Sequence, residues 1–284
     1  MAAVGVTDQV KYPVAMRFEK WQGTGNHHIV VERNLLGCDM TPDRAIELCN
    51  TEFGIGADGV LELSFEIDVP RMTLWNADGS QAENCGNGIR IVAAYLARDG
   101  RLPEDGLVLT GAERTHVRIL GDGLVQVRMG RALLPNGPRA TALSTSAGPI
   151  AFIEVSMGNP HAVVQDADPD VRVAVLGPEL EVHEHFPHRT NVEFVRTDGP
   201  SELTMRVWER GVGETLSCGT GACASAVAAV VAAGAVSPIH VHVAGGTLVI
   251  DVDDDLTVTM TGPVEHVYTG ELSPGFAASL AGVY

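Results

Sequence analysis

The stretch ENCGNGIR, from Glu83 to Arg90, places a cysteine directly before two glycines and an apolar run. Nearly the same phrase, LSCGTGAC, returns from Leu216 to Cys223. The two cysteines, Cys85 and Cys218, are 133 residues apart (218 minus 85). Self-similarity at a fixed offset is the sequence signature of an internal repeat, and such a repeat predicts further matches at this offset.

Other pairs of residues recur at the same spacing. The turn Gly25–His28 matches Gly158–His161, and Asn76 and Glu209 each stand nine residues before a cysteine. The phrase LVQVRMG from Leu124 also resembles LTVTMTG from Leu256, at an offset of 132 that needs one single-residue gap. Several pairs at one offset predict a chain built from two related units.

The two units have similar predicted elements. Alternating or apolar runs predict strands. In the first unit these are 16–20, 29–32, 60–65, 71–75, 107–109, 115–120 and 124–129, and in the second 151–156, 162–165, 191–196, 204–209, 239–243, 247–252 and 256–261. Helical spacing predicts helices at about 86–98 and 219–233, with a further one at 42–50 after the N-cap Thr41.

This order of elements predicts an α+β fold with two pseudo-symmetric β-rich lobes, each wrapped around a central helix. We assign residues 1–133 plus 268–284 to the lobe that carries Cys85, and 134–267 to the lobe that carries Cys218. The turn Pro135-Asn136-Gly137-Pro138 lies at the joint. A cleft between two matched lobes is a natural ligand site.

The composition excludes several classes of function. The chain has 284 residues and a formal charge of −17, from 36 acidic and 19 basic residues. Such a charge repels nucleic acid and anionic membranes, which leaves a small-molecule substrate as the expected partner. The lysines are Lys11 and Lys20, and neither is related by the repeat to a cysteine motif, which disfavours a pyridoxal phosphate enzyme.

The cysteines are few and odd in number. They are Cys38, Cys49, Cys85, Cys218 and Cys223. Such a set does not resemble a disulfide framework, and the chain shows neither a signal-peptide pattern nor a bilayer-length apolar run. We therefore expect a cytoplasmic protein. Cys38, Cys49 and Cys223 have no cysteine partner in the repeat and are interpreted as structural.

Cys85 and Cys218 both immediately precede a predicted helix. The first N–H groups of a helix lack internal partners and carry partial positive charge, so we expect a lowered thiol pKa and an anion site there. If the lobes face each other, a carboxylate held by both helix ends would place its neighbouring carbon between two thiols. One thiolate could then remove a proton while the other thiol delivers one to the opposite face.

Two further patterns carry less weight. GIGADG, from Gly54 to Gly59, has the spacing of a dinucleotide-binding loop, but a predicted strand follows it where that loop requires a helix. HEHFPH, from His183 to His188, could ligate a metal, although a solvated loop is the simpler interpretation. We therefore expect no nucleotide, metal or other cofactor.

The motifs resemble those of the diaminopimelate epimerase family. The resemblance rests on NADGSQAENCGNGIR from Asn76, ERGVGETLSCGTGACAS from Glu209, MRFEKWQGTGN from Met16, MGNPHAV from Met157 and RTNVEFV from Arg189. It runs from Met16 to about Gly270, and residues 1–15 look like an extension. The family usually has Gly-Asn-Asp-Phe where this chain has Gly25-Asn26-His27-His28, and many members have glutamine at the position of Gly59.

This resemblance implies a cofactor-independent two-base epimerase that interconverts LL- and meso-diaminopimelate in lysine and peptidoglycan precursor synthesis. Cys85 and Cys218 match the catalytic acid/base pair, with Glu209 and His161 beside the reaction centre. The positions that match substrate contacts are Asn26, Asn76, Gly86, Asn87, Asn159, Asn191, Arg210, Gly219 and Thr220. The family is often homodimeric, so a homodimer is the expected assembly.

Three alternatives stay open. The same chemistry could act on another amino acid in secondary metabolism. It could act on proline or hydroxyproline, although those relatives have histidine where this chain has Asn87. The third is a non-catalytic thiol sensor or an amino-acid-binding protein.

Overall fold

The computed structural model describes residues 16–66, 69–82 and 85–282, so the predicted extension at 1–15 lies outside the described residues. The first lobe contains β1 (Arg17–Gly23), β2 (Asn26–Glu32), η1 (Arg33–Leu35), α1 (Pro42–Cys49), β3 (Gly59–Glu66), β4 (Val69–Asn76), β5 (Gln81–Ala82), α2 (Gly86–Arg98), β6 (Asp105–Thr110), β7 (Glu113–Gly121) and β8 (Leu124–Arg131). The second contains β9 (Thr141–Thr145), β10 (Gly148–Ser156), β11 (Pro160–Gln165), α3 (Pro169–Glu181), β12 (Asn191–Gly199), β13 (Glu202–Glu209), β14 (Gly213–Thr215), α4 (Gly219–Ala233), β15 (Ile239–Val243), β16 (Gly246–Val252) and β17 (Thr257–Pro263), followed by β18 (Glu265–Glu271) and α5 (Pro274–Ala281).

The two lobes match strand for strand. In the first, β2 runs parallel to β3 with His28 opposite Gly59, and in the second, β11 runs parallel to β12 with His161 opposite Asn191. The parallel pair of β4 and β6 likewise corresponds to the pair of β13 and β15. Asn76 and Glu209 are both the last residue of their strand. The repeat predicted from the sequence is therefore present in the backbone.

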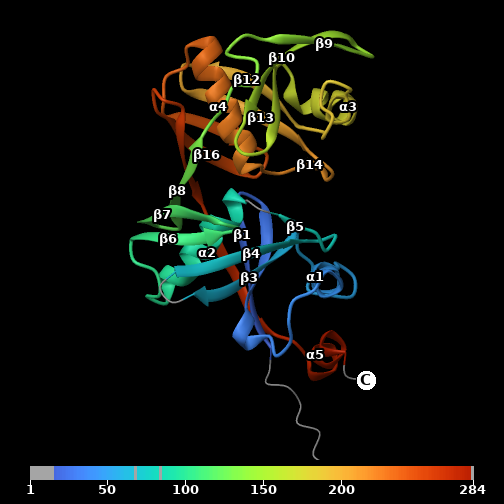
Figure 1. The fold of residues 1–284 in the computed structure, drawn as a ribbon, viewed down its shortest axis with the longest axis vertical. Coiled ribbons are helices and arrows are strands. Elements are labelled where there is room, and N and C mark those ends of the chain that lie inside the picture. Colours follow the sequence, from blue (N-terminus) through green and yellow to red (C-terminus); the bar gives the residue numbers. More distant parts are fainter. Residues whose placement is uncertain (1–15, 67–68, 83–84, 283–284) are drawn as a thin grey trace, which may run out of the picture.

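Strands of the two lobes also pair across a seam. β8 of the first lobe runs antiparallel to β17 of the second, with Val127 opposite Met260. After β17 the chain returns, and β18 pairs with β1, with Phe18 opposite Gly270. Figure 1 shows the two lobes one above the other, with the red C-terminal segment running back along the blue N-terminal strand. The seam therefore joins both lobes by backbone hydrogen bonds.

Each lobe encloses one helix and carries another on its outer face. α2 and α4 share one buried cluster, which includes Ile89 and Val92 from α2 and Ala222 and Val227 from α4. α4 has no charged residue, as expected for a helix that is surrounded by protein. α1 and α5 pack on the other face of the first sheet, and α3 packs on the other face of the second.

The structure confirms the bounds of both central helices and adds elements that the sequence analysis lacks. α3 is missing from the prediction because it contains Gly177 and Pro178, which disfavour helix. A β-carbon at Gly177 would lie 2.7 Å from Cβ of Trp208, so this glycine allows α3 to approach β13. β9 and β18 are also new. Among the described residues, no helix is both long and apolar enough to span a lipid bilayer.

Candidate active site

The two repeated cysteines are the N-cap residues of the central helices. Cys85 has extended backbone (φ −150°, ψ 101°), and its Sγ accepts a hydrogen bond from Gly88 N at 3.2 Å. Cys218 is also extended (φ −118°, ψ 113°), and its Sγ accepts from Gly221 N at 3.4 Å. Each sulfur thus occupies the position where a helix start supplies N–H donors.

The two helix starts lie against the same side chain. A β-carbon at Gly86 would be 2.7 Å from Cε of Met260, and one at Gly219 would be 3.3 Å from that atom. Asn87, the second residue of α2, donates to the carbonyl of Ser217 at 3.3 Å, immediately before Cys218. Because Met260 lies on the seam strand β17, both thiol-bearing turns converge where the lobes meet. The missing β-carbons keep their backbone N–H groups accessible to an anion.

A buried chain of polar side chains lies beside Cys218. His161 Nδ1 is 2.7 Å from Glu193 Oε1, and both side chains are fully buried. The other ring nitrogen of His161 is 3.0 Å from Asn159 Oδ1, and Asn159 Nδ2 donates to the hydroxyl of Thr220 at 3.4 Å. That hydroxyl lies 3.5 Å from the Cys218 sulfur. This series of contacts fixes the ring of His161 and connects it to the thiol of Cys218.

The ends of β12 and β13 hold the next group of predicted residues. Asn191 Nδ2 donates to the carbonyl of Pro160 at 2.9 Å, and its Oδ1 accepts from Arg210 N at 3.0 Å. Thr215 donates its hydroxyl to Glu209. The side chain of Arg210 is exposed, in contrast to the buried Asn191. The structure thus brings Asn191, Glu209 and Arg210 together, with a guanidinium that is free to reach a ligand.

The first lobe supplies Asn26, Asn87 and Asn76. Asn26 Oδ1 accepts from Asn87 Nδ2 at 3.1 Å and from His28 Nε2 at 2.9 Å. Asn87 therefore joins Asn26 to the segment before Cys218. Asn76 instead donates to the hydroxyl of Ser80 at 3.0 Å, and its backbone faces Gly59. No hydrogen bond connects the Asn76 side chain to the other predicted residues within the part of the chain that the structure describes.

His28 and Gly59, at which the chain departs from the family pattern, pack against each other. Gly59 lies opposite His28, and a β-carbon at Gly59 would be 3.2 Å from His28 Nδ1 and 2.7 Å from the carbonyl of Trp75. A larger residue at position 59 therefore conflicts with this histidine and with the neighbouring strand. The imidazole of His28 is buried, and its Nδ1 has no hydrogen-bond partner in the part of the chain that the structure describes.

The thiol pKa values move in a direction opposite to the one predicted. Burial raises the pKa of Cys85, and the Gly88 N–H only opposes that rise. Burial also raises the pKa of Cys218 well above its ordinary value, and the carboxylates of Glu209 and Glu193 add to the effect. The expected lowering is wrong as a net result because desolvation of the thiolate outweighs the helix-start hydrogen bond.

Two other groups at the site have shifted pKa values. Burial raises the pKa of Glu209, and the Thr215 hydroxyl and the Cys218 thiol oppose it. This carboxylate acts on both thiols, since it raises the pKa of Cys85 as well as that of Cys218. Burial lowers the pKa of His28 to about 4, although Asp58 opposes the change. His28 is therefore neutral at physiological pH.

Sequence reasoning missed Glu193 and Arg90. Both are completely buried charged side chains, which proteins rarely place in the interior without a partner or a role. The available signal was their position. Glu193 interrupts an apolar strand, and Arg90 follows the glycines of the first cysteine motif.

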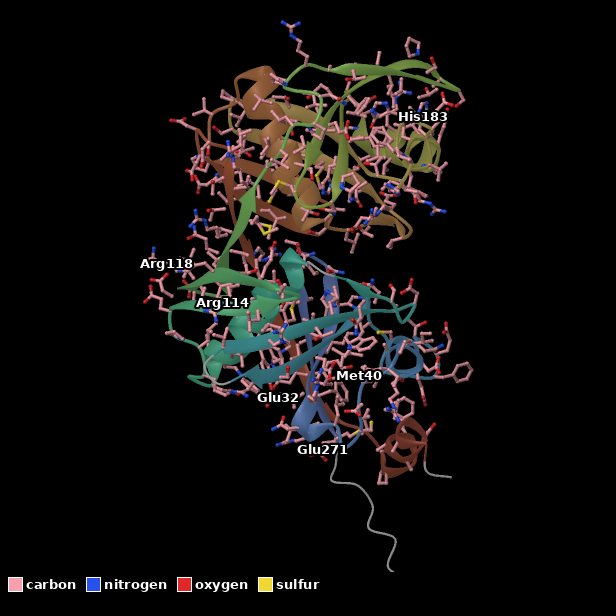
Figure 2. The ribbon with its side chains drawn as sticks, in the orientation of Figure 1. Glu32, Met40, Arg114, Arg118, His183 and Glu271 are labelled. Atoms are coloured by element: carbon pink, nitrogen blue, oxygen red, sulfur yellow. The ribbon has the colours of Figure 1, made fainter. Side chains whose placement is uncertain are left out.

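The structure also places the two further sequence patterns, GIGADG and HEHFPH. GIGADG is followed by β3 and not by a helix. Figure 2 shows His183 beside α3, on the part of the second lobe far from the seam. In the described ranges there is no group of three His, Cys, Asp or Glu side chains that could hold a metal ion.

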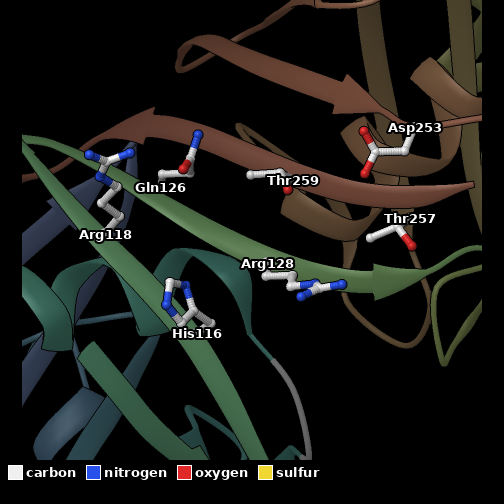
Figure 3. A pocket seen from close by; sticks show the side chains of 7 residues that line it. All are labelled: His116, Arg118, Gln126, Arg128, Asp253, Thr257 and Thr259. Carbon is white, nitrogen blue, oxygen red and sulfur yellow. The ribbon is translucent and has the colours of Figure 1, made fainter. Parts of the chain in front are cut away.

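A cavity of about 290 Å³ lies elsewhere, on the outer face of the seam. It is lined by His116, Arg118, Gln126, Arg128, Asp253, Thr257 and Thr259. Figure 3 shows these side chains on β7, β8, β17 and the segment before β17. Gln126 and Arg128 alternate with the buried Val125 and Val127, so they face away from the central helices. None of the predicted site residues lines this cavity.

Known proteins resemble the chain over most of its length. A family model described as diaminopimelate epimerase matches residues 18–134 and 153–267, so that each matched segment contains one cysteine motif. The diaminopimelate epimerase of Pelotomaculum thermopropionicum is 40% identical over 277 residues, which cover 90% of this chain and 98% of that protein. The chloroplastic diaminopimelate epimerase of Oryza sativa is 39% identical over 297 residues, which cover 95% and 83%.

Solved structures of lower identity share the fold. A hydroxyproline epimerase from Agrobacterium vitis has a TM-score of 0.68 at 15% identity and covers 91% of each chain. A PhzF-family phenazine biosynthesis protein from Bacillus anthracis has a TM-score of 0.67 at 15% identity and covers 91% of this chain and 99% of that one. The predicted fold, two repeated β-rich lobes, is confirmed. With the family model and these relatives covering both cysteine-bearing lobes, the chain belongs to the diaminopimelate epimerase family, a family of isomerases.

Proposed function

We propose that this protein interconverts LL- and meso-diaminopimelate without a cofactor, in lysine and peptidoglycan precursor synthesis. The observation that carries the proposal is the pair of N-cap cysteines, whose helix starts meet at Met260. An inversion at carbon needs one base and one acid on opposite faces, and two thiols can take both roles. The names of the relatives supply the substrate.

In the proposed reaction, one cysteine thiolate takes the α-proton while the other thiol delivers a proton to the opposite face. The negative charge that develops at the α-carbon spreads onto the adjacent carboxylate. The first N–H groups of α2 and α4, at Gly86, Asn87, Gly219 and Thr220, lack intrahelical partners and would hold that carboxylate. Because these donors are held in place before the reaction, they stabilise the transition state without having to reorganise.

The far end of the substrate carries a second carboxylate and ammonium group. The exposed guanidinium of Arg210 can grip a carboxylate in a bidentate manner. The side chains of Asn76, Asn159 and Asn191 add neutral donors and acceptors there, whereas Glu209, whose carboxylate acts on both thiols, would hold the ammonium group on the reacting carbon. A site that must hydrogen-bond these groups disfavours amino acids that lack them.

His161 is proposed to act beside the reaction centre. Its ring is held between Glu193 and Asn159, and Asn159 reaches Thr220 at the start of α4. This support fixes the imidazole relative to the carboxylate-binding turn.

The working assembly would be a homodimer, which light scattering of the purified protein can measure.

Exchange of the α-hydrogen tests the proposal. Purified protein, with no cofactor added, is incubated in deuterated water with LL- or meso-diaminopimelate, and the product is examined by mass spectrometry and chiral chromatography. Deuterium at one α-carbon together with interconversion of the stereoisomers is expected. Lack of exchange with every diaminopimelate stereoisomer would refute the substrate assignment. Exchange with free proline or another amino acid in the same assay would redirect it.

A further inference from the structure

Among the described residues, Arg90 is a buried cation without a carboxylate partner. Its side chain is completely inaccessible to solvent. The guanidinium donates to Met260 Sδ at 3.4 Å and to the Thr24 hydroxyl at 3.5 Å, and its Nε has no hydrogen-bond partner in the described ranges. These are weak acceptors for a charge that proteins normally bury only beside an anion. No ion pair involves Arg90 within the residues that the structure describes.

The site is shaped to hold this guanidinium. A β-carbon at Gly262 of β17 would lie 3.0 Å from Nε of Arg90, and one at Gly23 of β1 would lie 3.3 Å from Nη2. The planar group therefore fits between two glycines, one on the first lobe and one on the seam strand. Side chains at either position would displace it. The two glycines therefore leave room for the guanidinium at this one position, which fixes where the charge lies.

The contacts of Arg90 lead to both thiol-bearing turns. Its acceptor Thr24 also makes a buried 2.6 Å hydrogen bond to the hydroxyl of Ser217, the residue before Cys218. Its other acceptor, Met260, packs against the first residue of each central helix. Arg90 itself lies on α2, in the second turn of the helix that begins after Cys85. The charge therefore lies where the turn that carries Cys85 meets the turn that carries Cys218. We call each of these cysteines, with the start of the helix that follows it, a half-site.

Arg90 acts on the Cys85 half of the site. Among the residues that the structure describes, the charged groups that act on Cys85 are Glu209, which raises the thiol pKa, and Arg90, which lowers it. The groups that face Cys218 are Glu209 and Glu193, and both raise its pKa. Burial lowers the pKa of Arg90 only to about 10, so the guanidinium stays protonated at neutral pH.

The repeat gives the second lobe no counterpart of this cation. The position that matches Arg90 on α4 is Cys223, 133 residues later, and burial raises the pKa of that thiol to about 12. One half-site thus has an added cation, and the other has an added carboxylate. We propose that Arg90 is a positioning residue that makes Cys85, rather than Cys218, the thiolate of the resting pair. This inference deepens the function proposed above and rests on it.

The assignment gives the first half-reaction a direction. The α C–H bond of the substrate breaks and its proton becomes the S–H of Cys85, while the S–H proton of Cys218 becomes the new C–H bond on the opposite face. Cys218 is then the thiolate and Cys85 the thiol. The resting pair returns when a proton passes from Cys85 to Cys218 through water. Arg90 favours that return because it stabilises the thiolate at Cys85.

Alkylation of the thiols as a function of pH tests the assignment. Each cysteine of the substrate-free protein is alkylated with iodoacetamide, and its peptide is quantified by mass spectrometry from pH 6 to 11. The midpoint of each profile is compared, and not the rate, because Cys218 is the less accessible thiol. In the unmodified protein we expect the lower midpoint for Cys85. A lower midpoint for Cys218 would overturn the proposal without any variant.

Substitutions then connect the difference to Arg90. Arg90→Met should raise the Cys85 midpoint by about one pH unit, which is about tenfold less thiolate at neutral pH, and should move the Cys218 midpoint less. Arg90→Lys should restore the profile because it keeps the charge. Arg98→Met removes a surface arginine of the same helix and should change neither midpoint. A folded Arg90→Met protein with an unchanged Cys85 midpoint would refute the role of Arg90. None of these readings needs turnover, so inactivity toward diaminopimelate would count against the proposed function alone.

Discussion

Gly88 and Gly221 are the third residues of α2 and α4, and each lies between its cysteine and a strand of its own lobe. A β-carbon at Gly88 would lie 2.9 Å from Cδ2 of Leu61, whereas one at Gly221 would lie 2.7 Å from Oε1 of Glu193. The repeat thus places an apolar side chain in one half-site and a carboxylate at the matching place in the other. The two lobes therefore share the backbone and the thiols but differ in the surrounding charges.

This difference matters because the two thiols need unlike protonation states. An acid and a base of identical environment would share the proton equally, so that only part of the protein would be ready for a given stereoisomer. Arg90 beside Cys85 and Glu193 beside Cys218 both favour the same distribution.

The largest effect should come from removing either thiol. Cys85→Ala and Cys218→Ala should each lower the rate of stereoisomer interconversion by about 10³-fold or more, because a positioned acid or base contributes up to about 10⁴-fold. The measurement is the initial rate with each isomer. Cys38→Ala removes a thiol outside the site and should behave as the parent protein. Near-parental activity in either of the first two variants would rule out the two-base mechanism.

The next effect concerns Glu193, whose place in the first lobe is taken by Leu61. Glu193→Leu gives the second lobe the same side chain as the first, and it leaves Nδ1 of the buried His161 without its carboxylate partner. We expect a loss of about 3 kcal/mol in the free energy of unfolding, measured with urea, because breaking a buried pair strands one polar group. Glu202→Leu is the matched control. It breaks a half-exposed contact with His242, and should cost less than about 1 kcal/mol. Equal losses in the two variants would contradict the role given to burial.

A methyl group at each of the two glycines compares the half-sites directly. Gly221→Ala should lower kcat about 10²-fold, because the added carbon meets the hydrogen-bonded carboxylate of Glu193, whereas its distance to the cysteine sulfur, 3.3 Å, is close to the 3.4 Å at Gly88. Gly88→Ala should cost about tenfold or less, because the end of the Leu61 side chain can move aside. Gly275→Ala, on α5, has no atom near its added carbon and serves as control. The comparison fails if Gly88→Ala is as damaging as Gly221→Ala.

Much of this architecture was predictable because each motif and each alternating strand is a short pattern that can be recognised in the sequence alone. The Cys-Gly-x-Gly motifs, their offset and the alternating strands gave both central helices with their bounds. The assignment of residues 268–284 to the first lobe implies that the chain returns there, but the pairing of β18 with β1 was not predictable, because it depends on a contact between residues far apart in sequence. Gly270 makes room there for the ring of Phe18, since a β-carbon would lie 2.5 Å from that ring. α3 was missed because tertiary packing overrides its poor helix propensity.

The site was less predictable than the fold. The sequence located the thiols, but the net direction of their pKa shifts depends on how deeply each is buried. The sign was wrong because a helix-start argument includes the hydrogen bond and omits desolvation. Arg90 and Glu193 were missed for a related reason, since a charge in an apolar stretch shows its role only when its neighbours are known. The residue boundaries assigned to the two lobes stay a prediction.

The smallest effect concerns His28, which matches His161 in the repeat but, among the described residues, makes no hydrogen bond to a carboxylate. Burial lowers its pKa to about 4, so the unfolded chain, with an ordinary value near 6.5, binds the proton more tightly. Stability is therefore lost as pH falls from about 6.5 toward 4, by about 2 kcal/mol at pH 5. His28→Phe should remove this acid sensitivity, whereas His188→Gln, at an exposed histidine, should retain it. Urea unfolding at pH 7 and pH 5 measures both. A His28→Phe protein as acid-sensitive as its parent would show that the buried imidazole does not cause the loss of stability. The different hydrogen-bond partners of His28 and His161 would then have no effect on the pH dependence of stability.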